Sequence, residues 1–137
     1  MRTKNFLILC FLLSLQSCKK EDMDGDFVVF VGEWKCEYRY IHQTYTLEPV
    51  IGTAYEHTLY IYSNGKYRIS IPDQRDNKGR IREIQHVAGG EYQFEFIPNF
   101  LTSLDLINRG WYEIFLNGNS LAIYTNGSWD YKYVKVN

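Results

Sequence analysis

The chain has 137 residues, of which 45% are hydrophobic and 17% aromatic, and its formal charge at pH 7 is −1. This length suits a single domain built around one hydrophobic core. The near balance of 15 basic and 16 acidic side chains argues against a nucleic-acid-binding protein, which would carry a basic face, and against electrostatic attachment to anionic lipid.

Residues 1–17 have the pattern of a secretory signal. Arg2 and Lys4 precede an apolar run over residues 6–15, and the small residue Ser17 follows it, which is the order of a cleaved signal peptide. The apolar run is about ten residues long, whereas a helix that spans a bilayer needs about 20. We therefore predict cleavage after Ser17 rather than a transmembrane segment.

The Leu-Gln-Ser-Cys sequence at residues 15–18 resembles the processing site of bacterial lipoproteins. That resemblance implies that Cys18 is lipidated, becomes the first residue of the mature protein and anchors it in the outer membrane. Each buried methylene contributes about 0.8 kcal/mol, so more than one acyl chain gives stable anchoring. The alternative is an ordinary secretory signal that leaves Cys18 as a thiol.

The residues after Cys18 carry a second resemblance. Lys20, Glu21 and Asp22 resemble the lysine-and-acid pattern of surface-exposed lipoproteins of the Bacteroidota, which implies that the protein faces the cell exterior. They also fit a polar tether, because such residues cannot bury enough apolar area to order themselves. We predict a signal peptide over residues 1–17, a flexible tether over 18–26 and one folded domain over 27–137. Removal of the signal leaves 120 residues with 13 basic and 16 acidic side chains, a formal charge near −3.

Under this interpretation Cys36 is the one cysteine left for the domain. Cys10 leaves with the signal and Cys18 takes lipid, so no internal disulfide forms. Cys36 alternates in phase with Trp34 and Tyr38, so we predict a small buried hydrophobic residue rather than a reactive thiol.

Residues 34–40 form the clearest predicted strand. Its apolar positions are Trp34, Cys36, Tyr38 and Tyr40. Strict alternation with one apolar face is typical of a half-buried antiparallel strand. Residues 42–55 contain Pro49 and Gly52, which interrupt regular structure, and we expect a long loop or a ragged strand there.

Residues 56–71 read as a hairpin around residues 63–65, and its loop length decides which side chains face the core. A two-residue turn would pair Ile61 with Arg68. A three-residue loop with left-handed Gly65 pairs Ile61 with Tyr67 and gathers the apolar residues on one face. Each large apolar side chain contributes about 1.5–3 kcal/mol when buried, so we predict the three-residue loop.

The rest of the chain supplies further short strands separated by turns. We predict a polar loop at residues 72–80, a turn or short helix at 99–109, and strands at 81–88, 92–96, 111–116, 121–124 and 129–136. In the hairpin of residues 111–124, four loop residues align Leu116 with Leu121 and Ile114 with Ile123. The last strand is apolar on both faces, so its pattern does not indicate which face lies inside. Seven or eight sequential strands predict an all-β antiparallel meander, either a sandwich or a closed barrel.

Three short motifs carry a resemblance to a known family. They are Gly32-Glu33-Trp34 after an apolar lead-in, the hairpin of residues 59–67, and the terminal residues 131–136. Together they resemble small lipocalin-like lipoproteins of the Bacteroidota. The resemblance implies a closed or nearly closed barrel of about eight strands, with structural roles for Gly32 and Trp34 and with Trp34 at the closed end. Lys132 or Lys135 would substitute for the family's late arginine, which stacks on this tryptophan.

No catalytic motif appears in the sequence. A nucleophile elbow, a Cys-x-x-Cys pair and a His-Glu-x-x-His motif are all missing, so we expect neither an enzyme nor a cofactor. His42, His57 and His86 lie on separate elements without ligand spacing, and we expect no metal site.

The aromatic content is more informative. Twelve tyrosines and three tryptophans fit the packing of a β-protein, and some could line a cup or a groove, since tyrosine offers an apolar ring with a polar tip. Tyr38, Tyr40 and Trp111 are our candidate ligand contacts.

We therefore expect a non-enzymatic, surface-displayed binding protein whose open barrel end takes a small apolar or glycan ligand. The alternative is a protein-interaction module, such as an accessory subunit or inhibitor, that acts through loops 72–80 or 98–109 and has no ligand cavity. A continuous apolar cavity of several hundred Å³ would favour the first function. A filled barrel with an exposed aromatic patch would favour the second.

Overall fold

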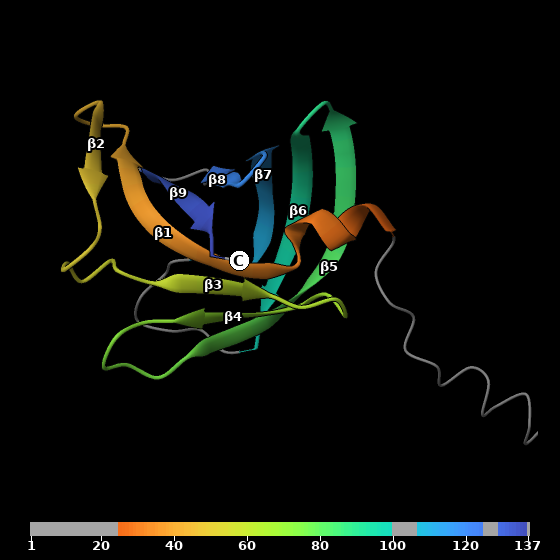
Figure 1. The fold of residues 1–137 in the computed structure, drawn as a ribbon, viewed down its shortest axis with the longest axis horizontal. Coiled ribbons are helices and arrows are strands. Elements are labelled where there is room, and N and C mark those ends of the chain that lie inside the picture. The colour runs from red at the N-terminus through yellow and green to blue at the C-terminus, as the bar shows by residue number, and fades with distance from the viewer. Residues whose placement is uncertain (1–24, 100–106, 125–128, 137) are drawn as a thin grey trace, which may run out of the picture.

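The computed structural model describes residues 25–99, 107–124 and 129–136. Within them, nine antiparallel strands form one sheet in the order β2-β1-β3-β4-β5-β6-β7-β8-β9, and β9 also pairs with β1 (Figure 1). Eight strands, β1 and β3 to β9, therefore close a barrel. The short β2 pairs with the last four residues of β1, 38–41. The predicted all-β antiparallel barrel is confirmed.

The elements follow the predicted order. They are η1 (Gly25–Phe30), β1 (Gly32–Ile41), β2 (Thr46–Pro49), β3 (Thr58–Ile61), β4 (Lys66–Ser70), β5 (Asn77–Ala88), β6 (Glu91–Pro98), β7 (Gly110–Asn117), β8 (Ser120–Tyr124) and β9 (Trp129–Lys135). The apolar lead-in before Gly32 is a 3-10 helix, η1, with Phe27 and Phe30 buried. The irregular segment 42–55 contains β2.

The predicted polar loop over residues 72–80 is wrong in its second half, because β5 begins at Asn77. Gly79 pairs with Tyr67 of β4, and both residues are buried. A Cβ at Gly79 would lie 2.5 Å from both the Tyr67 hydroxyl and the Ile97 carbonyl oxygen. The inward position therefore has to be glycine, and the lack of an apolar side chain there hides the strand pattern.

Both predicted hairpin registers are confirmed. Leu59 pairs with Ile69 and Ile61 with Tyr67, and Gly65 in the loop has a φ of 81°, a conformation that glycine adopts without strain. In the second hairpin, Leu116 pairs with Leu121 and Ile114 with Ile123.

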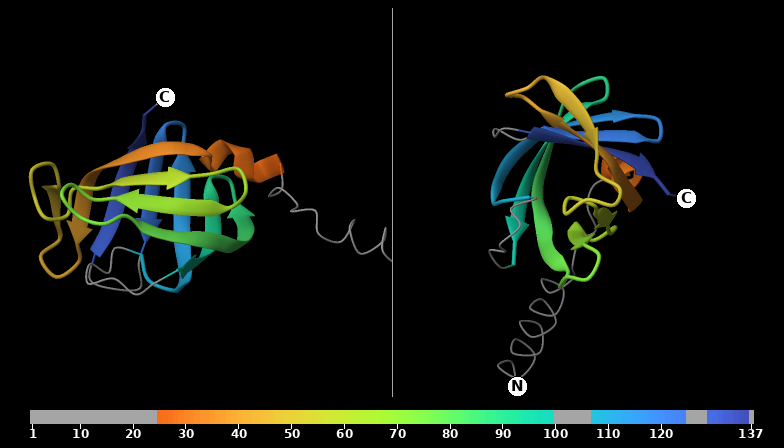
Figure 2. Two further views of the ribbon diagram at one scale, coloured as in Figure 1. Left: turned by 90° about the horizontal axis from the view of Figure 1, so that it is seen from below. Right: turned by 90° about the vertical axis from the view of Figure 1, so that its left-hand side faces the viewer.

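Helix η1 packs at one end of the barrel, beside β6 (Figures 1 and 2). The Phe30 ring makes edge contacts with Tyr92 and Phe94, with centroids 4.8 and 4.7 Å away. The Trp34 indole Nε1 donates a hydrogen bond of 2.8 Å to the Phe30 carbonyl oxygen. This bond ties η1 to β1, and the helix so held covers this end of the barrel.

Trp34 is fully buried and lies under Lys135. The Lys135 Nζ is 5.2 Å from the Trp34 ring centroid, and Lys132 is exposed, so Lys135 is the lysine that stacks on the tryptophan. Gly32 has a φ of 145°, and a Cβ there would lie 3.0 Å from the Lys135 Cε. Glycine at position 32 thus leaves room for the lysine stem.

A bulge in β1 reverses the side-chain alternation after Cys36. The pairing with β9 shifts between Cys36 and Tyr38, so Trp34 and Cys36 face inward while Tyr38 and Tyr40 face outward. The prediction that all four share one face is therefore wrong beyond Cys36. The same shift turns Arg39 inward, opposite the buried Tyr131.

The interior of the barrel is occupied by its own side chains. On β9, Tyr131 and Tyr133 face inward and are buried, which decides the orientation that the sequence left open. The cluster of buried hydrophobic residues includes Phe27, Phe30, Trp34, Cys36, Leu59, Ile61, Tyr67, Ile69, Phe94, Phe96, Ile114, Leu121, Ile123, Tyr131 and Tyr133. Cys36 is fully buried, as predicted, and burial raises the pKa of its thiol to about 12, which disfavours the reactive thiolate.

Candidate functional site

The predicted lipidation and export residues, Cys18, Lys20, Glu21 and Asp22, lie outside the described residues. In the described part of the chain, no helix combines the length and the apolar character needed to cross a membrane.

The three aromatic candidates do not form one site. Tyr38 is 40% exposed on the outer face of β1, and Tyr40 on the same face lies edge-on to His42, with ring centroids 5.1 Å apart. Trp111 is also 40% exposed, but it lies on β7, opposite Glu95, and β8 and β9 separate it from β1. Tyr38 and Tyr40 therefore do not line the inside of a cup.

The three histidines also lie apart. His42 Nε2 is 2.8 Å from the Asp130 carboxylate, and His86 Nε2 donates to the Gly89 carbonyl oxygen at 2.8 Å. Within the residues that the structure describes, no group of three or more histidine, cysteine, aspartate or glutamate side chains is placed to hold a metal ion.

His57 belongs to a buried polar cluster inside the barrel. Its Nδ1 lies 2.7 Å from the Tyr55 carbonyl oxygen, which can only accept, so Nδ1 donates and Nε2 accepts from the Tyr133 hydroxyl at 2.8 Å. Burial lowers the pKa of His57 to about 4 and raises that of Tyr133, because both charged forms are disfavoured in the interior. With each ring nitrogen and the phenol satisfied, this cluster is part of the core.

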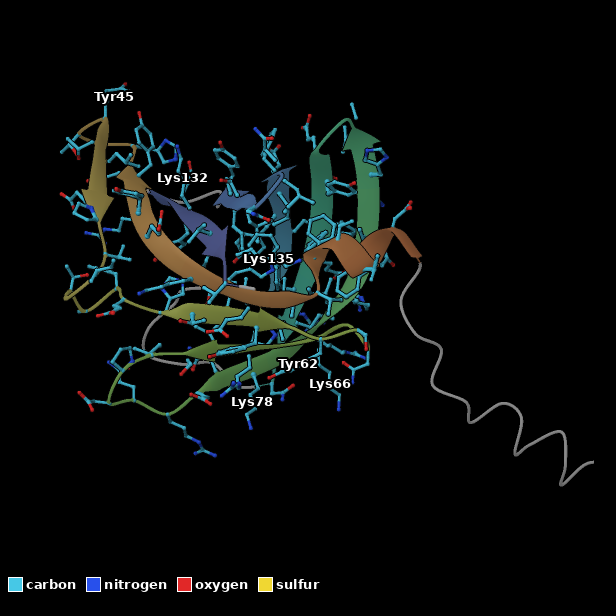
Figure 3. All side chains as sticks on the ribbon, in the orientation of Figure 1. Tyr45, Tyr62, Lys66, Lys78, Lys132 and Lys135 are labelled. Carbon is cyan, nitrogen blue, oxygen red and sulfur yellow. The ribbon has the colours of Figure 1, made fainter. Side chains whose placement is uncertain are left out.

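A groove on the outside of the barrel is a concave surface that the described residues line. It has a volume of about 620 Å³ and runs over the outer faces of β4 and β5. Its lining residues are Tyr62, Lys66, Tyr67, Arg68, Asp76, Lys78, Gly79, Arg80 and Asn99. Figure 3 shows Tyr62, Lys66 and Lys78 together on this side of the molecule. We call it the β4–β5 groove.

The positive charge of the β4–β5 groove comes from two rows of outward side chains. Lys66 pairs directly with Arg80, and Arg68 pairs with Lys78. Arg75 adds a fifth cation in an adjoining cavity of about 280 Å³. Among the described residues that line the two cavities, Asp76 is the only carboxylate.

Arg68 is held in place at the centre of the groove. Its Nη1 lies 3.0 Å from the Asp76 carboxylate, and its Nε donates to the Tyr62 hydroxyl at 3.2 Å. These two hydrogen bonds raise the pKa of Arg68 above its usual value. The guanidinium carbon also lies 4.1 Å from the Tyr60 ring centroid, so the cation is oriented before any ligand arrives.

Sequence reasoning missed the β4–β5 groove. Its second row of cations falls in the segment assigned to a loop, and its first row was considered only for hairpin register. The available signal was basic residues at alternate positions, Lys66 and Arg68 on one strand and Lys78 and Arg80 on the next.

The closed eight-stranded antiparallel barrel, with a short helix packed at one end, defines a lipocalin-like fold. The solved structure of a lipocalin-like protein from Bacteroides uniformis matches it with a TM-score of 0.52, covering 77% of this chain and 97% of that chain. The two sequences are 14% identical, so the likeness is one of fold. No protein-family profile matches this chain, and no curated protein matches its sequence.

Proposed function

We propose that this protein is a lipid-anchored, surface-exposed binding protein of the outer membrane that takes a glycan ligand and catalyses no reaction. The lipocalin-like barrel is an architecture of binding proteins. The interior is packed with its own aromatic and aliphatic side chains, which argues against the expected ligand cup at the open barrel end. The observation that carries the proposal is instead the open β4–β5 groove of about 620 Å³ on the outer surface.

The lining of the β4–β5 groove favours a glycan over the small apolar ligand. Ligand sites of about 300–1,000 Å³ are common, and those for apolar ligands are lined mainly by hydrophobic side chains. Here the lining consists mostly of cations, a carboxylate, an amide and the phenol of Tyr62. Such groups bind hydroxyl-rich molecules, and the exposed Tyr62 ring offers a flat face for a sugar.

Mass spectrometry of the protein purified from its native membrane tests this function. We expect an oligosaccharide to accompany the protein. A stoichiometric protein partner with no sugar would instead support the interaction module, and an apolar molecule retained in the barrel would contradict the glycan proposal.

The lipid anchor is tested by replacing Cys18 with alanine. We expect the wild-type protein to carry acyl mass and to fractionate with membranes, and the C18A variant to lose both, because the thiol is the attachment point. Intact-mass measurement and membrane fractionation check this. A variant that stays with the membrane, together with a wild type that lacks acyl mass, would contradict lipidation at Cys18.

Surface exposure is tested at the acidic segment that follows. We expect the combined change of Lys20, Glu21 and Asp22 to alanine to leave the protein lipidated but to protect it from protease added to whole cells, because the export pattern is lost. A variant that is digested as fast as the wild type would reduce these residues to a polar tether.

A further inference from the structure

The β4–β5 groove contains two like-charge pairs at directly opposed positions of neighbouring strands. Lys66 faces Arg80, and Arg68 faces Lys78. Like charges directly opposite each other destabilise a sheet. A neutral polar side chain in place of Lys66 or Arg80 would remove the repulsion between them, whereas the charge of Arg68 is offset by its ion pair with Asp76.

The four cations form a regular array. Residues two apart on a strand lie about 6–7 Å from each other, and neighbouring strands are about 5 Å apart. Lys66, Arg68, Lys78 and Arg80 therefore form the corners of a small rectangle on the floor and rim of the groove. A linear molecule that carries a negative charge on each repeat would meet these cations in succession.

We infer that the β4–β5 groove binds an anionic oligosaccharide, through the carboxylate or sulfate groups on its sugars. The Arg68 guanidinium, already oriented by Asp76 and Tyr62, presents a planar fork that matches such oxyanions. Lys66 and Arg80 sit beside it as exposed cations, while the amide of Asn99 and the ring of Tyr62 are available to sugar hydroxyls and faces. This inference deepens the proposed glycan-binding function and rests on it.

The shape and composition of the groove favour this ligand over other polyanions. A membrane surface is flat and does not enter a concave site. Single-stranded nucleic acid binds on a series of exposed aromatic rings, whereas in the groove Tyr62 is the exposed ring and Arg68 covers the ring of Tyr60. Binding to anionic phospholipid vesicles and to a single-stranded oligodeoxynucleotide is measured alongside the sugars.

The test measures binding by the full-length protein purified in detergent. The probes are a galacturonate hexamer, which carries carboxylates, a sulfated maltohexaose and neutral maltohexaose. We expect at least one charged sugar to bind, more weakly as salt is raised, and maltohexaose to bind about tenfold more weakly or not at all.

The matched variants are Lys66→Gln with Arg80→Gln in the groove and Lys35→Gln with Lys132→Gln elsewhere on the barrel. Each pair removes two positive charges from exposed side chains. We expect the groove pair to weaken binding of the charged sugar about tenfold or more and the control pair to leave it within about twofold. The groove variant should unfold at an equal or higher denaturant concentration, because it relieves a like-charge pair; a purely structural role predicts the opposite.

The outcomes separate this inference from the function on which it rests. Binding of maltohexaose as tightly as the charged sugars, with no effect of the groove variant, would overturn the charged-ligand class and leave glycan binding intact. Failure of all three sugars would overturn both. Tighter binding to anionic phospholipid vesicles or to a single-stranded oligodeoxynucleotide, lost in the groove variant, would replace the sugar with that partner.

Discussion

Replacing Trp34 with alanine should lower the free energy of unfolding by about 3–5 kcal/mol, the usual loss when a core tryptophan is truncated. Trp34 is 0% exposed. It packs in the core, donates its indole N–H to the Phe30 carbonyl oxygen and lies beneath the Lys135 ammonium. The change therefore removes buried area, releases η1 from β1 and removes the ring on which Lys135 rests. A domain of this size is stable by only about 5–15 kcal/mol, so the effect is a large part of the total.

Urea unfolding of the chain from Gly25 onward measures this effect, with Tyr62→Ala as the matched control. Tyr62 is also a large aromatic residue of the barrel, but it is 42% exposed, and its hydroxyl serves as a partner of Arg68. We expect the control to shift the midpoint slightly. Equal shifts for the two variants would mean that Trp34 does not anchor the core.

Acid should destabilise the domain through His57. Its pKa is about 4 in the folded protein and about 6.5 in an unfolded chain. The unfolded state therefore binds more protons between these values. The contribution of His57 to the free energy of unfolding is fully present above pH 6.5 and is lost as the pH drops toward 4. At 1.36 kcal/mol per pKa unit, lowering the pH from 7 to 5 should remove about 2 kcal/mol through this group.

Unfolding of three proteins at pH 7 and pH 5 isolates the His57 contribution. His86→Gln removes a solvent-exposed imidazole and should show the same loss as wild type. His57→Gln removes the buried one and should lose about 2 kcal/mol less over this interval, although it is less stable at both pH values because its bond to Tyr133 is weakened. Parallel losses in all three proteins would mean that His57 is not held neutral by burial.

The barrel could be predicted from sequence because its strands carry their own pattern. The alternation in residues 34–36, 59–61 and 112–114 sorts side chains between core and solvent without reference to any neighbour. The three-residue loop at residues 63–65 followed from apolar pairing alone. The resemblance at Gly32 and Trp34 predicted that the sheet closes into a barrel, and the β1–β9 pairing confirms it.

The candidate site could not be predicted in this way, because it is made by pairing between strands. The bulge after Cys36 turned Tyr38 and Tyr40 outward, and nothing in the local alternation marks a bulge, since the extra residue is defined only against the paired strand. Gly79 carries no apolar side chain, so the first residues of β5, 77–80, were predicted as part of a loop, whereas in the structure Tyr67 packs against Gly79.

The sequence by itself determined an all-β chain, its hairpin registers and a buried Trp34 and Cys36, because burial of apolar side chains with period two leaves few other arrangements. Its overall charge of −1 argued against a basic binding surface. A basic groove exists only in the tertiary structure, because the register of β4 against β5 places Lys66 beside Arg80 and Arg68 beside Lys78. Charges that average out along a chain can still accumulate where two strands pair, since the local field depends on distance in space and not on position in sequence.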